Sequence, residues 1–115
     1  MRFNVLLPTL IAAVVAFESP AEELPVILTV HNQQFVPNKL VIPAGIKIRI
    51  VVRNQDSLPV EIESVDLSRE ILVAAHGESS FFVGPLQPAS YQFFNDFNRD
   101  MQGTIVVNSA VQKGQ

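Results

Sequence analysis

Short runs in which apolar side chains alternate with other residues constrain this chain more than any other feature of its sequence. In the runs 26–31 and 46–53 every second residue is apolar, which is the period of a β-strand with one buried face. Both runs are predicted to be half-buried strands of an antiparallel sheet. No segment shows a long helical period, and residues 66–73 are expected to form at most a short turn of helix. The chain is therefore expected to be all-β.

Turn residues separate these runs and indicate how many strands there are. Proline, glycine and asparagine interrupt the chain at 37–38, 43–45, 54–59 and 84–88. Between these turns, further strands are expected at 40–42, 60–64, 79–83, from residue 91, and at 103–107. Short strands with turns between them predict a two-sheet β-sandwich of about seven strands.

Composition excludes several classes of function. The 115 residues carry a formal charge of −3, which argues against a protein that binds nucleic acid by neutralising phosphates. The absence of cysteine excludes disulfides, thiolate metal sites and a cysteine nucleophile. No serine, histidine and acid grouping and no phosphate-binding glycine motif is recognisable, so no catalytic site is predicted. An electron-accepting part in the oxidation of ferrous iron stays open.

The N-terminus has the layout of a secretory signal peptide. Met1 and Arg2 are followed by an almost wholly apolar run at 5–15 and by small residues that suit cleavage after Ala21, or alternatively within 14–16. The apolar run is shorter than the roughly 20 residues of a membrane span, although an uncleaved anchor is the alternative. A signal peptide at 1–21 and one domain at 22–115, located in the periplasm without a membrane span, are therefore predicted.

Carboxylates give the clearest candidate site. Glu61 and Glu63 are two residues apart on a predicted strand, so their side chains share one face and repel unless something positive lies beside them. A bound cation is one such partner. Hard oxygen ligands suit Fe³⁺, Mn²⁺ or Ca²⁺, whereas Cu²⁺ and Fe²⁺ normally take an imidazole as well.

The polar loop at 95–102, between two predicted strands, adds further candidates, because loops held by core strands often carry sites. The candidate metal ligands are Glu63 and Asp96, with Glu61, Glu70 and Met101 as additional ones. Each also has a structural explanation: arginines at 49, 53, 69 or 99 can pair with the carboxylates, Asp96 can be a turn residue, and Met101 can fill the core. His31 and His76 are expected at the surface, and His76 is kept as a less favoured additional candidate for a metal ligand.

Two stretches resemble cupredoxins. Residues 35–45 (FVPNKLVIPAG) are similar to the F-x-P-x-x-L-x-V-x-A-G motif of that family, and an N-x-D loop follows at 54–56. Residues 91–103 resemble the family's copper-binding loop, in which a Cys, a His and a Met precede a glycine. The resemblance implies a Greek-key β-sandwich.

The ligand residues of that family are mostly replaced. The resemblance assigns the first His to a position near Val60, the Cys to Asn95 or Asp96, and the second His to about Asn98, while Met101 stands where the axial methionine would be. A blue-copper centre needs two histidines and a thiolate. A blue-copper electron carrier is therefore excluded.

A narrower resemblance points to iron uptake. Residues 59–70 (PVEIESVDLSRE), the Pro85–Leu86 pair and residues 91–97 (YQFFNDF) are similar to cysteine-free periplasmic cupredoxin-like proteins of the FtrB type and to the cupredoxin domain of EfeO. This resemblance implies a protein that binds copper or iron through carboxylates. Its implied partners are a membrane iron permease or a periplasmic iron-binding protein. Asn95 and Asn98 stand where that motif has Asp and His.

A different class of function remains open. The alternative is a metal-free β-sandwich that docks a protein partner through a partly exposed aromatic cluster. Its proposed members are Phe81, Phe82, Phe93, Phe94 and Phe97.

Overall fold

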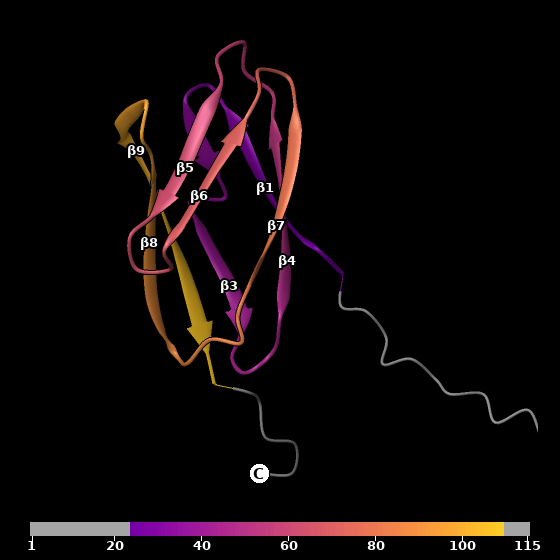
Figure 1. The fold of residues 1–115 in the computed structure, drawn as a ribbon, viewed down its shortest axis with the longest axis vertical. Helices are drawn as coiled ribbons and strands as arrows, with labels where there is room; N and C mark the ends of the chain where they lie inside the picture. The colour runs from indigo at the N-terminus through magenta and orange to yellow at the C-terminus, as the bar shows by residue number, and fades with distance from the viewer. Residues whose placement is uncertain (1–23, 110–115) are drawn as a thin grey trace, which may run out of the picture.

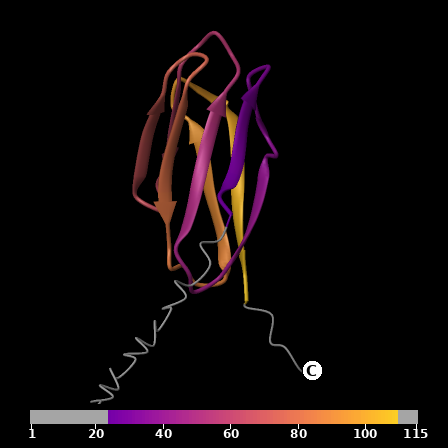
Figure 2. The same cartoon turned by 90° about the vertical axis from the view of Figure 1, so that its right-hand side faces the viewer.

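Two β-sheets packed face to face make up the structure (Figures 1 and 2). The computed structural model describes residues 24–109, and all nine elements found there are strands, which confirms the predicted all-β sandwich. No helix in this part of the chain is long and apolar enough to cross a membrane. The predicted signal peptide at 1–21 and its cleavage site lie outside the described residues.

The first sheet has four strands and the second has five. The first sheet, in the order β2-β1-β4-β7, contains Gln34–Val36, Val26–His31, Ile48–Asn54 and Glu78–Val83. The second, in the order β3-β9-β8-β5-β6, contains Lys39–Pro43, Asn98–Asn108, Ala89–Asn95, Val60–Ser64 and Arg69–Val73. Strands β2 and β6 bring the number to nine, where the sequence predicted about seven.

Strand β6 replaces the helical turn that was expected within 66–73. Ser68 has a φ of 51°, in the left-handed region, and its N–H donates to the carbonyl of Val65 at 3.2 Å. The chain therefore reverses direction over residues 65–68 instead of starting a helix. The residues that follow pair antiparallel with β5, which places Glu70 directly opposite Glu63.

The pairing of β1 with β4 is also different from the prediction. These strands are parallel, with Leu28 opposite Val52, whereas an antiparallel arrangement was expected. Parallel neighbours need a long crossover, and here the chain forms β2 and then leaves for β3 in the other sheet before it returns. On its other side, β4 is antiparallel to β7, so the expectation is correct for that pair.

The core lies between the sheets and comes from the alternating apolar residues. Leu28, Val30, Ile50 and Val52 of the first sheet face Val60, Ile62 and Val73 of the second, and all are at most 4% exposed. The rings of Phe35 and Phe93 meet edge to face with centroids 4.9 Å apart. The two sheets are thus joined by one continuous apolar layer.

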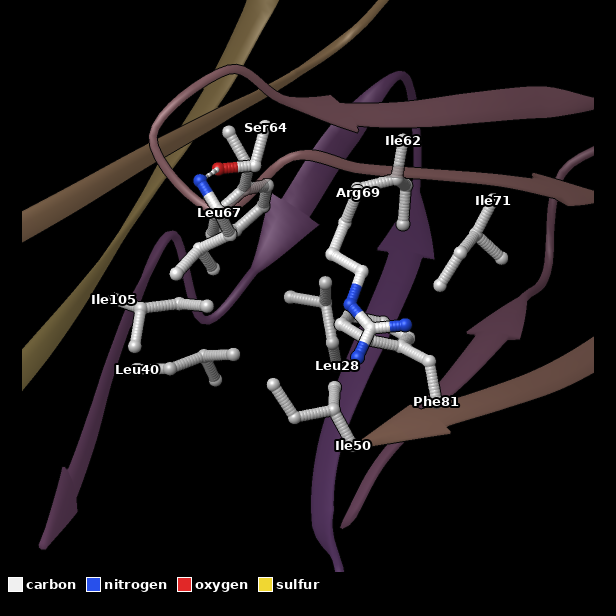
Figure 3. A pocket seen from close by; sticks show the side chains of 11 residues that line it. Leu28, Leu40, Ile50, Ile62, Ser64, Leu67, Arg69, Ile71, Phe81 and Ile105 are labelled. Carbon is white, nitrogen blue, oxygen red and sulfur yellow. Dashed lines mark hydrogen bonds between the residues drawn. The ribbon is translucent and has the colours of Figure 1, made fainter. Parts of the chain in front are cut away.

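A narrow cavity within this layer is too small to be a binding chamber. Leu28, Ile62, Phe81 and the aliphatic neighbours drawn in Figure 3 line it, and the side chain of Arg69 lies along it. The space left for a water-sized molecule is about 10 Å³, which is close to the minimum that one water needs. This cavity therefore leaves no room for a ligand larger than a water molecule.

Replacing Gly103 by alanine should destabilise the sandwich. Gly103 lies opposite Phe93 on β8, and a Cβ added there would overlap the phenyl ring. Overpacking of this kind costs about 1–3 kcal/mol, because Phe93 must leave its place against Phe35. Chemical denaturation of Gly103→Ala measures this loss. The exposed Ser90→Ala on β8 is the matched control and should stay within about 0.5 kcal/mol of the parent; an equally stable Gly103→Ala would contradict the packing described.

Candidate functional site

Four connections gather at one end of the sandwich, the upper end in Figure 1. They are the turn at 32–33, the loop at 55–59, the loop at 74–77 and the turn at 96–97, and together they are called the loop end. Backbone hydrogen bonds join them: Gln55 N–H donates to the Val30 carbonyl at 2.9 Å, and His76 N–H donates to the Asp56 carbonyl at 3.0 Å. The loop end is thus a connected surface.

Two side chains, those of Asn54 at the end of β4 and of Asp56 in the loop that follows, hold the loop end together. The amide of Asn54 donates to the carbonyls of Leu58 (2.8 Å) and Ala74 (3.1 Å). The carboxylate of Asp56 accepts the N–H groups of Asn32 and Gln33, both at 2.8 Å. Asn32 and Gln33 have φ values of 50° and 58°, so this carboxylate stabilises a turn that has no glycine. The N-x-D motif predicted a turn, but its role as a clamp was not predicted.

The side chain of Asn95 lies inside the loop end, and Met101 lies beside it. Asn95 is 2% exposed and Met101 is 4% exposed. The Oδ1 atom of Asn95 accepts the N–H groups of Glu61 and Phe97, both at 3.1 Å, and its Nδ2 donates to the Sδ atom of Met101 at 3.5 Å. Every polar atom of this side chain is therefore engaged.

Asp96 points the other way. Its carboxylate accepts from the guanidinium of Arg99 at 2.9 Å, and its N–H donates to the Glu61 carbonyl at 2.8 Å. The resemblance allows either Asn95 or Asp96 at the position of the copper-binding Cys. Of these two residues, only Asn95 points into the protein. The position of the first His is Val60, which is fully buried, and that of the second His is Asn98, which is half-buried.

Copper does not fit the positions that the cupredoxin resemblance assigns to its ligands. Valine has no donor atom, and a neutral amide is a poor substitute for a thiolate or an imidazole. The thioether of Met101 is the one soft donor there, and it already accepts a hydrogen bond from Asn95. Within residues 24–109 no buried side-chain nitrogen or oxygen lacks a partner, so none is left to receive an ion at this place.

Three glutamates form a cluster elsewhere, on the outer face of the five-stranded sheet. Glu61, Glu63 and Glu70, called the glutamate cluster, each offer a carboxylate oxygen that lies within 4.8 Å of those of the other two. Glu63 and Glu70 are cross-strand partners on β5 and β6, and Glu61 lies on the same face two residues before Glu63. The structure therefore brings together three of the five predicted ligands.

The other two predicted ligands have different environments. Asp96 is paired with Arg99, and Met101 is part of the hydrophobic core. His31 and His76 are both exposed, as expected, and neither belongs to the glutamate cluster.

The glutamate cluster carries no basic partner within residues 24–109. The ion pairs there join Arg53 to Glu78 at 3.2 Å and Arg99 to Asp96 at 2.9 Å. The explanation by surface pairing is therefore correct for Asp96 but does not apply to Glu61, Glu63 or Glu70. Like charges directly opposite one another destabilise a sheet, and no ion pair within residues 24–109 offsets them here.

The five phenylalanines predicted as one docking surface are dispersed. Phe93 is buried and Phe81 packs against the core. Phe82 lies on the first sheet with Lys47 over its ring, whereas Phe94 lies on the second sheet beneath Arg99. Only Phe97 is at the loop end. The predicted aromatic cluster is therefore wrong as a single surface.

A shallow groove at the loop end carries the apolar residues that are exposed there. Leu58 and Phe97 are 57% and 56% exposed, and they border this groove with Pro59 and with the uncharged side chains of Gln33 and Asn98. Its lining has no charged residue.

Comparison with known proteins identifies the family to which this fold and sequence correspond. Residues 5–107 match the family model of the cupredoxin-like domain. An uncharacterized protein of Rickettsia prowazekii (strain Madrid E) is 41% identical over 82 residues, which cover 70% of this chain and 66% of that protein. The chain thus spans slightly less than two thirds of the length of this relative.

Solved structures of amicyanin share the fold. The amicyanin of Paracoccus versutus superposes with a TM-score of 0.60 at 15% identity, covering 79% of this chain and 86% of that one. A proline-to-phenylalanine variant of amicyanin in its reduced state gives a TM-score of 0.62 at 13% identity, with 79% and 87% covered. At these identities the likeness concerns the fold alone.

Replacing Asp56 by alanine should loosen the loop end. The change leaves the N–H groups of Asn32 and Gln33 without their acceptor in a turn with positive φ. Hydrogen bonds to a charged group contribute about 1.5–3 kcal/mol, and partial exposure reduces this to about 1–2 kcal/mol here. Urea denaturation of Asp56→Ala measures the loss. Asp100→Ala, which removes an exposed carboxylate from β9, is the control, and equal stability of the two variants would refute the clamp.

Proposed function

This chain belongs to the cupredoxin-like domain family, and from that premise we propose that it binds a metal cation through the glutamate cluster and not at the loop end. Fold and site are separate questions, because one fold supports unrelated chemistries. A methionine-to-alanine variant of amicyanin, which shares the fold, has been solved in a Cu(I) form. The corresponding end of this chain has Val60, Asn95 and Asn98 in place of the ligands that the resemblance requires.

The observation that carries the proposal is the approach of three carboxylates that form no ion pair with any residue in the range 24–109. Their ligand atoms are within 4.8 Å of one another, and a cation between them would replace mutual repulsion by attraction. Glu61 and Glu63 are half-buried, which strengthens electrostatic interactions relative to a fully solvated group. Carboxylate oxygens favour hard ions such as Fe³⁺, Mn²⁺ or Ca²⁺, and Cu²⁺ or Fe²⁺ would bind here without an imidazole.

The biological role that we propose is that of an accessory protein in ferrous-iron transport. It is supported by the resemblance of residues 59–70 and 91–97 to the FtrB and EfeO type, and all three glutamates of the cluster are part of the 59–70 motif that carries this resemblance. The ion bound is copper or iron in this proposal, and the partner is a membrane iron permease or a periplasmic iron-binding protein. The proposed location is the periplasm, which the signal-like segment at 1–21 supports.

Titration of the purified protein tests the cation site. Mn²⁺, Cu²⁺ and Fe²⁺ are each added in a calorimeter under conditions that keep iron reduced. At least one should bind with a dissociation constant of about 10⁻⁴ M, the range of exposed carboxylate sites outside cells. Glu63→Gln and Glu70→Gln should each weaken binding by about tenfold or more, since each removes a charged ligand.

Glu78→Gln is the matched control. Glu78 is also a strand glutamate, but it lies in the four-stranded sheet, away from the glutamate cluster, and is already paired with Arg53 of the same sheet. The substitution should leave cation affinity unchanged. No heat above buffer for any of the three ions, or equal losses in Glu78→Gln and Glu63→Gln, would refute the site.

A second function is favoured by a separate observation at the loop end. Leu58 and Phe97 are more than half exposed on an uncharged surface, as expected where a protein partner docks. If the chain docks to a permease or to an iron-binding protein through this surface, Leu58→Ala and Phe97→Ala should weaken that complex while cation titration stays as in the parent. Val65→Ala, at an exposed residue outside this surface, should leave both the complex and the cation titration as in the parent.

A further inference from the structure

The cupredoxin-like fold implies a metal at the loop end, and the residues there do not accommodate one. We infer that the carboxamide of Asn95 takes over the structural task of that ion: it links the segments that a metal would link and keeps the loop end folded without metal. This inference concerns a different part of the molecule from the glutamate cluster and does not depend on it.

The three hydrogen bonds of Asn95 reach the relevant segments. Its Oδ1 accepts from Glu61 N–H, next to Val60 at the position of the first His, and from Phe97 N–H, next to Asn98 at the position of the second His. Its Nδ2 donates to Met101, at the position of the axial methionine. Each bond thus ends at or beside one ligand position that the resemblance assigns.

One of these bonds is long-range, so Asn95 is more than a turn residue. The bond to Phe97 alone is the local pattern by which asparagine commonly caps a turn. The bond to Glu61 spans 34 residues and ties the start of β5 to the end of β8, where the register of the β8–β9 pair is irregular. The backbone bond from Asp96 N–H to the Glu61 carbonyl at 2.8 Å reinforces the same junction.

The burial of Asn95 disfavours metal binding at this place. Asn95 is 2% exposed, and a buried amide that loses a partner pays a desolvation cost that water cannot relieve. An ion that bound to Met101 Sδ would displace Asn95 Nδ2 and leave this donor unpaired. Since the site offers no thiolate, imidazole or carboxylate in return, the hydrogen-bonded state is favoured over the metal-bound state.

Thermal unfolding in the presence of a chelator tests the structural task. Asn95→Ala should lower the unfolding midpoint by about 8 °C or more, because two buried N–H groups lose their acceptor in a small domain. Asn98→Ala, which truncates the asparagine at the start of β9, should stay within about 2 °C of the parent. A drop in Asn95→Ala no larger than that in Asn98→Ala would overturn the inference.

Hydrogen exchange covers the case in which Asn95→Ala does not fold. In the parent protein with chelator, the amides of Glu61 and Phe97 should be protected at least tenfold more than that of exposed Asp100, because both donate to Asn95. Exchange of these two amides as fast as in an unstructured peptide would show that Asn95 does not hold them.

Silver(I) tests the exclusion of metal. It is a soft ion that selects thioethers and thiolates over carboxylates, so its effect at Met101 is independent of whether the glutamate cluster binds cations. The chain has two methionines, Met1 and Met101, so the ε-methyl NMR signal of Met101 is readily assigned. In the parent this signal should not move with up to a tenfold excess of Ag⁺.

Asn95→Cys is the positive control for this measurement. It places a thiolate beside the Met101 sulfur, and the Met101 signal should then shift with about one equivalent of Ag⁺. A saturable shift of this signal in the parent protein would overturn the inference, whatever the calorimetric result at the glutamates.

Discussion

A buried amide must have its donors and acceptors satisfied, and this requirement at Asn95 governs the loop end of the molecule. The side chain joins β5, the β8–β9 turn and β9 through one oxygen and one nitrogen. It has no capacity left for an ion, and its neighbours Val60 and Met101 are sealed in the core. The loop end keeps the shape of a cupredoxin-like domain, but the polar groups of Asn95 form hydrogen bonds within the protein instead of binding a metal.

The glutamate cluster follows from the same architecture in a different way. Strand β5 leads away from the Asn95 junction and points Glu61 and Glu63 outward while Val60 and Ile62 fill the core. Strand β6 then adds Glu70 opposite Glu63. The proposed cation site therefore lies on the outer face of a sheet and not at the end of the sandwich, in a place where charge can be exposed without disturbing the core.

Much of the fold was predictable from sequence because one face of most strands is buried. The period-two runs at 26–31 and 46–53 correctly indicated β1 and β4, but alternation carries no information on whether neighbours are parallel, and their pairing was predicted wrongly. Strand β6 was not predicted because its residues, Arg69–Val73 (REILV), show no clear alternation of polar and apolar side chains. In addition, the left-handed backbone conformation of Ser68, which forms the turn before β6, cannot be predicted from the presence of a serine. A turn that depends on a single φ value is decided by tertiary contacts.

The candidate site was predictable only in part, for related reasons. The shared face of Glu61 and Glu63 follows from strand geometry alone, whereas the approach of Glu70 required β6 to be a strand. Asp96 was assigned to the site because it lies in the polar loop between two predicted strands, but its carboxylate pairs with Arg99, three residues later. Anomalous X-ray scattering from crystals soaked in Mn²⁺ or Cu²⁺ tests the central claim most directly. One anomalous peak that bridges Glu63 and Glu70 is expected; a peak within bonding distance of Met101 Sδ would contradict the proposed placement of the cation site.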